Sequence, residues 1–300
     1  MTSNNIKKLI THNGSFHTDD IFACATLILK LEKDEEKYEI IRTRDPEIIN
    51  EGDYVFDVGG IYDEASNRFD HHQVGGAGKH NNGIEYSSFG LLWKKWGVVL
   101  SGNEKVAELI ENELVSPIDA VDNGIDLVEF KNSIKPFFVQ DFFRSMRPTW
   151  REENITLDQM FLKSVSLAKE ILSREIIHAK DVVLAKERIA SIYLNTRDKK
   201  ILIFDEDYPS ADILQTFPEP LYVVYPRPSD GFWGVKAVRD NSKSFKNRKD
   251  FPKTWSGLTG EELARITNVP DAVFCHRALF LAIAKSQEGA IKLAQIAVES

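Results

Sequence analysis

The chain has 300 residues, of which 42% are hydrophobic, 28% charged and 10% aromatic, and its formal net charge at pH 7 is −8. This composition is ordinary for a folded protein and excludes disordered and fibrous classes, while the length suits two domains better than one. The negative net charge argues against a surface coated with basic residues for duplex nucleic acid, but it leaves room for a local basic patch.

We expect neither a membrane span nor a secretory signal in this sequence, and no cysteine cluster. No apolar run approaches the roughly 18 residues that span a bilayer, and the first residues lack the apolar stretch of a secretory signal. We therefore expect a cytoplasmic protein with no membrane partner. The two cysteines, Cys24 and Cys275, form no CxxC pair, which argues against a disulfide framework and a zinc finger. Cys24 lies in an apolar run, where a small buried side chain is its expected role.

The first half of the chain alternates short β-branched runs with helical segments, the pattern of a parallel sheet covered by helices. The runs at residues 7–12, 38–43 and 54–60 indicate buried strands. Residues 19–37 begin with aspartates, carry an apolar stripe and end in charged residues, as a crossover helix does. Further helices are predicted at residues 85–97, about 104–117 and, at the end of the chain, about 288–299.

The middle of the chain has a long helical pattern that is followed by strands. Residues 156–194 have apolar residues at three- and four-residue spacing with no Pro or Gly, which predicts either one long helix or two. The strands predicted after it lie at residues 199–205, 221–226, 232–238 and 272–276. We therefore predict an α/β protein with an N-terminal parallel-sheet domain over residues 1–153, a helical linker over 154–198 and a smaller C-terminal α/β domain over 199–300.

Histidines and aspartates gather near the predicted strand ends of the first 125 residues. Four of the seven histidines lie between residues 12 and 72, each beside an aspartate or at the end of a predicted strand. Together with the neighbouring aspartates they fall into four segments: residues 11–20, Asp57, residues 68–73 and residues 118–124. Because the carboxyl ends of parallel strands face one crevice, groups that are distant in sequence converge there. We expect the four segments to form one site.

Each segment taken alone also has a structural explanation. His12 and His17 suit ordinary capping or loop positions, and Asp19 with Asp20 suits the cap of a helix. Asp119 and Asp122 suit the solvated face of a short helix. Four separate coincidences would be needed to explain the whole pattern in this way, so one shared site is favoured.

Imidazole and carboxylate together suit Mn²⁺, Fe²⁺ or Zn²⁺, and the absence of a nearby thiolate argues against a structural zinc site. Six or more candidate ligands are too many for one tetrahedral ion. A pair of ions about 3.5–4 Å apart that share a bridging carboxylate would employ all of these candidate ligands. Such a pair is the usual arrangement in enzymes that catalyse displacement at phosphorus. Asp57, alone at its strand end, is the expected bridge. A histidine of the Asp70-His71-His72 triplet that binds no metal is expected to donate to the phosphate or to protonate the leaving oxygen.

These motifs resemble the DHH superfamily of phosphoesterases and, within it, the Myg (melanocyte proliferating gene product) family. The motifs are THNGSFHTDD at residues 11–20, RTRDP at 42–46, DVGG at 57–60, FDHH at 69–72 and DAVDNGI at 119–125. Weaker similarity at residues 147–150, 255–258 and 288–294 extends the resemblance over nearly the whole chain. The resemblance implies a DHH-type metal-binding catalytic domain in the first half and a substrate-binding domain in the second. Relatives include manganese-dependent pyrophosphatases, RecJ-type exonucleases and oligonucleotide phosphodiesterases, and the Myg proteins are associated with 3′ to 5′ exonuclease activity on RNA.

Carried over by position, the resemblance implies two divalent ions, Mn²⁺ foremost and Mg²⁺ as the alternative. The implied metal ligands are His12, His17, Asp19, Asp57, His71 and Asp122, with Asp119 as the competing choice for the last. Asp57 is the implied bridging ligand and His72 the catalytic neighbour of His71, so the catalytic candidates are Asp57, Asp70 and His72. The chain departs from the superfamily in its first motif, where His17 stands in the place of the first aspartate. This departure leaves the ligand set of one metal open.

Candidate substrate contacts lie both near the metals and in the second half. Arg42 and Arg44, just after a predicted strand, are expected to clamp a phosphate. Residues 227–253 contain eight Lys or Arg and three Asp with interleaved aromatic residues, the composition of a surface that tracks phosphates and stacks unpaired bases. The candidates in this stretch are Arg239, Lys243, Lys246 and Arg248. A solvated loop with a few core aromatic residues is the equally weighted alternative.

The second domain of DHH enzymes usually carries a glycine-rich segment that grips the substrate. The matching stretch at residues 274–290 has no glycine pair. His276 and Arg277 remain as candidate phosphate contacts there, with a structural role as the alternative for His276.

The favoured hypothesis is an exonuclease or short-oligonucleotide phosphodiesterase whose partner is single-stranded RNA or DNA. One alternative is a small-molecule phosphohydrolase acting on pyrophosphate or a nucleotide, for which the basic stretch is dispensable. The other is a metal-binding nucleic-acid adaptor without turnover, which the altered first motif and the missing glycine pair favour. The oligomeric state stays open, with a homodimer as one option.

Overall fold

The computed structural model describes residues 6–241 and 244–300, and it confirms the predicted α/β class. The chain divides into two compact units, Met1–Lys180 and Asp181–Ser300, which are described separately below. Within the described residues, no helix has both the length and the apolar character that crossing a bilayer requires.

The first unit is built around a five-stranded sheet with the strand order β2-β1-β3-β5-β4. The strands are β1 (Lys7–Thr11), β2 (Tyr38–Arg42), β3 (Tyr54–Phe56), β4 (Tyr62–Asp63) and β5 (Arg68–Phe69). The neighbouring pairs among β2, β1, β3 and β5 are parallel, and β4 is antiparallel to β5. Because β1, β3 and β5 run in the same direction, the residues that follow them lie at one edge of the sheet.

Helices of the first unit cover this sheet and supply further residues to its edge. They are α1 (Thr18–Lys33), α2 (Pro46–Asn50), α3 (Ser88–Ser101), α4 (Glu104–Ile110), α5 (Ser116–Asp122) and α6 (Val139–Ser145). α1 packs against α3, and each of them contacts the sheet. The helix expected at residues 104–117 is interrupted by the π-helical turn η1 (Glu111–Val115), a feature often found at functional sites.

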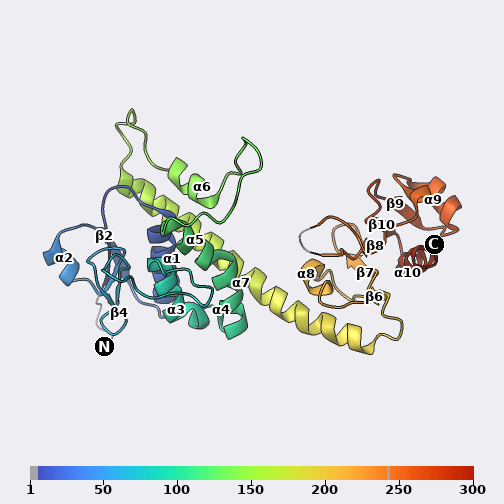
Figure 1. Cartoon of the computed structure of the whole chain (residues 1–300), viewed down its shortest axis with the longest axis horizontal. Helices are drawn as coiled ribbons and strands as arrows, with labels where there is room; N and C mark the ends of the chain where they lie inside the picture. The colour runs from blue at the N-terminus through green and yellow to red at the C-terminus, as the bar shows by residue number, and fades with distance from the viewer. Residues whose placement is uncertain (1–5, 242–243) are drawn as a thin grey trace. The chain divides into compact units, whose positions relative to one another are not determined.

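The long apolar pattern forms a single helix, α7 (Leu157–Asn195), which decides between the one-helix and two-helix predictions (Figure 1). Phe161, Val165 and Leu172 are buried on one face of its first part. Ala185 and Ile189 belong to a core cluster of the second unit. The division between the two units therefore falls inside α7.

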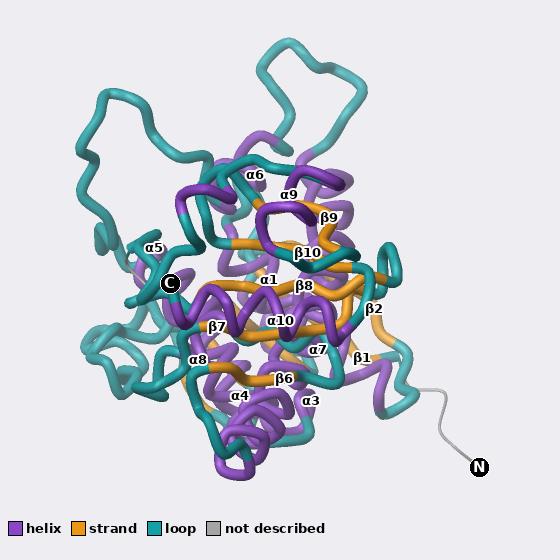
Figure 2. Tube along the Cα trace, turned by 90° about the vertical axis from the view of Figure 1, so that its right-hand side faces the viewer, coloured by secondary structure: helices purple, strands orange, loops and turns teal. Residues whose placement is uncertain are grey.

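The second unit contains a five-stranded sheet with the strand order β6-β7-β8-β10-β9, and α10 lies against it (Figure 2). The elements are β6 (Ile201–Ile203), α8 (Ala211–Leu214), β7 (Tyr222–Arg227), β8 (Phe232–Ala237), the 3₁₀ turn η2 (Lys253–Trp255), α9 (Gly260–Thr267), β9 (Ala272–Cys275), β10 (Leu281–Ala284) and α10 (Gln287–Glu299). Among the strand pairs of residues 181–241 and 244–300, β6–β7 is parallel and the other three are antiparallel. The sequence did not predict β10 or α9, because both are short and depend on contacts made with distant residues.

A close approach between α3 and α5 gives a test of the packing in the first unit. A Cβ atom at Gly90 would lie 1.8 Å from Oδ2 of Asp119 and 2.8 Å from Cδ1 of Tyr86. We expect Gly90→Ala to lower the free energy of unfolding by about 1–3 kcal/mol, as overpacking of a core does. Urea denaturation followed by circular dichroism measures the change. The exposed Val99→Ala in the same helix is the control, and an unchanged Gly90→Ala stability would contradict this packing.

Candidate metal centre

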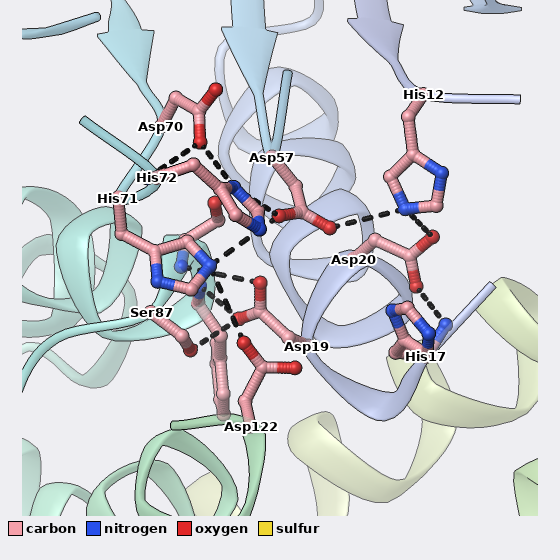
Figure 3. Close-up of polar contacts among 12 residues, drawn as sticks. His12, His17, Asp19, Asp20, Asp57, Asp70, His71, His72, Ser87 and Asp122 are labelled. Atoms are coloured by element: carbon pink, nitrogen blue, oxygen red, sulfur yellow. Dashed lines mark hydrogen bonds and ion pairs between the residues drawn. The ribbon is translucent and has the colours of Figure 1, made fainter. Parts of the chain in front are cut away.

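Side chains from the sheet edge and from two helices converge on one cluster in the first unit (Figure 3). His12 follows β1 and Asp57 follows β3, whereas His71 lies two residues beyond β5. Asp19 is in the first turn of α1, and Asp122 is the last residue of α5. The structure thus brings together residues from all four segments in which the sequence placed its candidates.

The ligand atoms of this cluster form three overlapping groups, each with its atoms within 4.8 Å of one another. The groups are His12, His17 and Asp57; Asp57, His71 and His72; and Asp19, His71 and Asp122. Asp57 belongs to the first two groups and His71 to the last two. This overlap fits two neighbouring cation positions better than one.

Asp57 lies between the two sides of the cluster. Its Oδ2 is 3.2 Å from Nε2 of His12, and its Oδ1 is 3.5 Å from Nε2 of His71. The backbone of Asp57 is in the left-handed region, with φ 54°, which aspartate tolerates better than most residues do. Burial opposes ionisation of this carboxyl, but the contacts with His12 and His71 outweigh it and hold the pKa of Asp57 below its usual range.

Asp20 also belongs to the cluster, although the sequence placed it in the first motif only as a helix cap and not as a ligand. Its Oδ1 accepts a hydrogen bond of 2.7 Å from the backbone N–H of His17, and its Oδ2 is 3.3 Å from Nε2 of His12. Burial alone would lower the pKa of His12, yet Asp20 and Asp57 raise it to about 10. The only sequence signal for Asp20 was its position three residues after His17, where an acidic side chain reaches back to the start of a helix.

Two buried atoms of the cluster make the donor set fit a metal ion. Nε2 of His71 and Oδ2 of Asp20 make no hydrogen bond of good geometry among the described residues, although each lies 3.3 Å from a group of opposite character, Asp122 and His12 respectively. A buried polar atom without a partner costs about 1–3 kcal/mol, and coordination to a cation satisfies such an atom. Burial and the charge of Asp57 raise the pKa of Asp122 to about 6, which indicates a surplus of negative charge. Imidazole nitrogens and carboxylate oxygens suit Mn²⁺ and similar divalent ions.

Asp119 and Asp122, the two alternatives of the fourth motif, have different surroundings. Asp122 is 3.3 Å from Nε2 of His71 and belongs to the third group. Asp119 lies outside the three groups, and both of its oxygens are bonded within the protein. Its Oδ1 is 2.5 Å from Oγ of Ser87, and its Oδ2 is 2.6 Å from Nε2 of His80. The geometry therefore favours Asp122 as the ligand and gives Asp119 a supporting place.

His80 is a second residue that sequence reasoning missed. It is 5% exposed, and its Nδ1 is 2.8 Å from Oε1 of Glu111 in the π-helical turn. Glu111 and Asp119 raise the pKa of His80 to about 9 against the opposing effect of its burial. His80 lies in a loop with neither strand nor helix periodicity, so only its contacts with distant residues identify it.

Asp19 is anchored by the residues that begin α3. Its Oδ1 accepts from the N–H of Phe89 at 2.6 Å, and its Oδ2 accepts from the N–H of Ser88 at 3.2 Å. Oγ of Ser87 lies 2.5 Å from Oδ1 of Asp19 and 2.5 Å from Oδ1 of Asp119, and its single O–H donates to one of these two carboxyl groups. A chain of short polar contacts thus leads from His80 through Asp119 and Ser87 to Asp19.

Asp70 and His72 form a pair at the exposed side of the cluster. Oδ1 of Asp70 is 2.7 Å from Nδ1 of His72, and Oδ2 accepts from the N–H of Gly60 at 2.6 Å. Asp70 is buried, whereas the side chain of His72 is 63% exposed, with its Nδ1 3.6 Å from Oδ1 of Asp57. The bond with Asp70 raises the pKa of His72 despite partial burial. Asp70 therefore orients His72, which faces solvent beside Asp57.

Arg42 and Arg44, the expected phosphate clamp, differ in their surroundings. Nη1 of Arg42 is 2.6 Å from Oδ1 of Asp158, its Nη2 donates to the carbonyl of Gly14 at 2.7 Å, and its side chain is 3% exposed. The guanidinium also lies 4.5 Å from the centre of the Phe161 ring. Arg42 is thus engaged in packing within the first unit instead of facing a ligand, while Arg44 is exposed.

The basic stretch of the second unit contains both exposed and structural residues. Arg239 lies 4.8 Å from the ring centre of Phe245, which is 88% exposed, and the side chain of Lys246 is 77% exposed. Arg248 instead donates to the carbonyls of Phe217 at 2.7 Å and Pro220 at 3.0 Å, so it holds a loop together. Lys243 lies outside the described residues.

The remaining aromatic and cationic candidates of the second unit are mixed in the same way. Phe251 and Trp255 are core residues, which fits the structural alternative for this part of the stretch. Nδ1 of His276 accepts from the N–H of Ala278 at 3.0 Å, and Arg277 is exposed.

The path from His80 to Asp19 predicts an effect on metal binding. We expect His80→Ala to weaken Mn²⁺ affinity by about 10–100-fold, the usual cost of removing a residue that supports a metal ligand. Glu111→Gln should have a smaller effect of the same sign. Electron paramagnetic resonance of free Mn²⁺ measures the affinity, with the exposed His178→Ala of α7 as the control. A folded His80→Ala protein with unchanged affinity would exclude this supporting role.

Comparison with known proteins assigns the chain to a family. Residues 8–298 match the family model MYG1_exonuc, described as "Uncharacterised protein family (UPF0160)". The MYG1 protein of Schizosaccharomyces pombe is 30% identical over 99% of this chain and 98% of its own length. The MYG1 exonuclease of Bos taurus is 29% identical over 95% of this chain and 83% of its own length.

A solved structure of RecJ in complex with Mn²⁺ from Thermus thermophilus aligns with 98% of this chain and 52% of that chain, at 13% identity and a TM-score of 0.28. A likeness this low carries no weight for fold or function. The family match and the identity with whole relatives do carry weight, and they confirm the resemblance found in the sequence: the chain belongs to the MYG1 family.

Proposed function

We propose that this protein is a metal-dependent phosphodiester hydrolase, and specifically a 3′ to 5′ exonuclease on single-stranded RNA or short oligonucleotides. The observation that carries the proposal is the overlap of three ligand groups around Asp57 and His71. A binuclear centre is the usual arrangement for displacement at phosphorus. The name of the bovine relative supports the nuclease class, and the polarity follows from the sequence resemblance.

In this proposal each side of the cluster holds one ion. His12, His17 and Asp57 would hold the first, and Asp19, His71 and Asp122 the second, with Asp57 shared. When bound, two divalent ions would supply a nucleophile near neutral pH and neutralise charge that develops on the phosphate. Mn²⁺ is the proposed metal and Mg²⁺ the alternative.

The protein's own residues contribute orientation and a proton. Asp70 fixes the imidazole of His72 through the 2.7 Å contact with Nδ1, which leaves Nε2 available. Since His72 is exposed beside Asp57, its Nε2 is placed to donate a proton to the leaving oxygen of a bound ester. Asp119 and His80 keep Asp19 in place through Ser87.

The proposal assigns catalysis to residues 1–153 and substrate binding to residues 199–300, with the linker at 154–198 between them in sequence. In the second part, Arg239 and Lys246 with the exposed Phe245 are the proposed contacts to a single strand, because cations beside an exposed ring suit phosphates and unpaired bases. Arg277 is a further exposed candidate. A cytoplasmic location and a homodimer stay predictions of the sequence.

The direct test of the activity is a substrate panel. Purified protein is incubated with Mn²⁺, Mg²⁺ or a chelator and with end-labelled single-stranded RNA, single-stranded DNA, pyrophosphate or an aryl phosphodiester. We expect metal-dependent shortening of the oligonucleotides from the 3′ end. Asp57→Ala and His71→Ala should abolish it, and His72→Gln should slow it by about 10²–10⁴-fold, the usual contribution of a general acid.

The outcomes of the panel separate the competing functions. Full activity in folded Asp57→Ala or His71→Ala protein would refute the site assignment, with His178→Ala again as the matched control. Hydrolysis of pyrophosphate without oligonucleotide cleavage would favour the small-molecule phosphohydrolase. Tight binding of RNA without turnover under saturating Mn²⁺ would favour the adaptor.

The basic stretch makes a separate prediction. We expect Lys246→Gln to weaken oligonucleotide turnover more than aryl ester turnover. It should also reduce by about 1 the slope with which the logarithm of the oligonucleotide binding constant falls with the logarithm of the salt concentration, because one phosphate contact is lost. Lys292→Gln, on the exposed side of α10, removes the same charge elsewhere in the second unit and serves as the control. Equal effects of Lys246→Gln on both substrates would exclude this contact.

A further inference from the structure

A cavity of about 360 Å³ borders the metal centre in the first unit. Its lining includes His17, Asp19 and Asp122 on the one hand and the two arginines Arg144 and Arg147 on the other. Its volume lies near the lower end of the range of about 300–1,000 Å³ that is typical of small-molecule pockets. The two arginines come from α6 and the turn after it, and neither was a candidate in the sequence.

Arg147 is held in place while one of its donors stays unused. Its Nη2 donates to the carbonyl of Phe16, and its guanidinium carbon lies 5.6 Å from the centre of the Phe16 ring. Nε of Arg147 is buried and has no hydrogen-bond partner among the described residues. Burial, together with the charge of Arg144, lowers the pKa of Arg147 in spite of the nearby Asp20. This guanidinium is therefore short of acceptors and would gain from an anion.

Arg144 adds a second positive charge to the same lining. Its side chain is 68% exposed, and its Nη2 is paired with Oδ1 of Asp141. Asp141 is itself fixed, because its Oδ2 accepts from the N–H of Phe138 at 3.1 Å at the start of α6. A guanidinium carries five N–H donors, so one ion pair leaves donors of Arg144 available for a ligand.

Building on the proposed function, we propose that Arg144 and Arg147 bind the phosphate of a nucleotide unit in this cavity. Guanidinium groups match phosphate through paired, charge-assisted hydrogen bonds. The neighbouring carboxylates of Asp19 and Asp122 repel an anion, and the two arginines offset that repulsion. The phosphate is thereby held next to the proposed metal ligands.

The rest of the lining points to a nucleotide instead of an inorganic phosphate. Ile118, Val121 and Phe143 give the cavity an apolar part, and Gln140 adds an amide. Pyrophosphate has no apolar surface to place against such side chains, whereas a sugar and base do. The cavity therefore deepens the proposed function by selecting nucleotides over pyrophosphate.

Calorimetric binding of three probes to the full-length protein with Mn²⁺ tests this subsite: adenosine 5′-monophosphate, adenosine and inorganic phosphate. We expect Arg144→Gln and Arg147→Lys each to weaken adenosine 5′-monophosphate binding by about tenfold or more, since each loses charge-assisted hydrogen bonds. Adenosine affinity and Mn²⁺ affinity should stay unchanged. Arg174→Gln, on an exposed part of α7 outside the cavity lining, is the control. Arg144→Gln is the safer variant for folding because its side chain is exposed.

Several results would overturn the inference without touching the proposed function. One is a wild-type protein that cleaves oligonucleotides while its folded Arg144→Gln and Arg147→Lys variants bind adenosine 5′-monophosphate as tightly as it does. Another is inorganic phosphate that binds as tightly as the nucleotide, which would remove the role of the apolar lining. Conversely, arginine-dependent nucleotide binding by a protein that cleaves no oligonucleotide would support the subsite and refute the proposed function.

Discussion

The concentration of buried carboxylates around Asp57 is the constraint on which the rest of the structure depends. Asp19, Asp20 and Asp57 are at most 5% exposed, and Asp122 lies beside them. Burying such charges costs several kcal/mol each unless cations oppose them. The histidines oppose them in part: contacts with Asp20 and Asp57 raise the pKa of His12 to about 10. Burial and the charge of Asp57 nevertheless raise the pKa of Asp122 to about 6. In the proposed function divalent cations would supply the remaining counter-charge, and their binding would then also stabilise the fold.

The scaffold holds this cluster with features that would be unfavourable elsewhere. Asp57 adopts a left-handed backbone, and the helix leading to α5 contains a π-helical turn that presents Glu111 to His80. Such irregularities persist where the surrounding structure fixes them, and they gather at functional sites. Asp119 lies against Gly90 and is also connected through Ser87 to Asp19, so the packing of α3 on α5 and the position of this candidate ligand depend on each other.

The sequence was sufficient to predict those features of the fold and the site that depend on local residue patterns and on the topology of parallel strands. The α/β class followed from alternating strands and helices, and the meeting of the residues after β1 and β3 followed from the rule for parallel strands, whereas the short strand β5 before His71 was not predicted. It was insufficient where a side chain's role depends on partners far along the chain. Asp20 was considered only as a helix cap, His80 lay in a loop without periodicity, and the cavity arginines came from the short helix α6 and the turn after it. Arg42 and Arg248 carry the expected charge, yet their guanidinium groups already bind partners within the protein. Arg42 binds Asp158 and the carbonyl of Gly14, and Arg248 binds the carbonyl of Phe217.

The most direct measurement of the central claim is anomalous X-ray diffraction from crystals of the protein soaked in Mn²⁺. Two neighbouring manganese peaks are expected, one among His12, His17 and Asp57 and the other among Asp19, His71 and Asp122. Absence of manganese from both positions at saturating concentration, or its binding only elsewhere in the chain, would contradict the account.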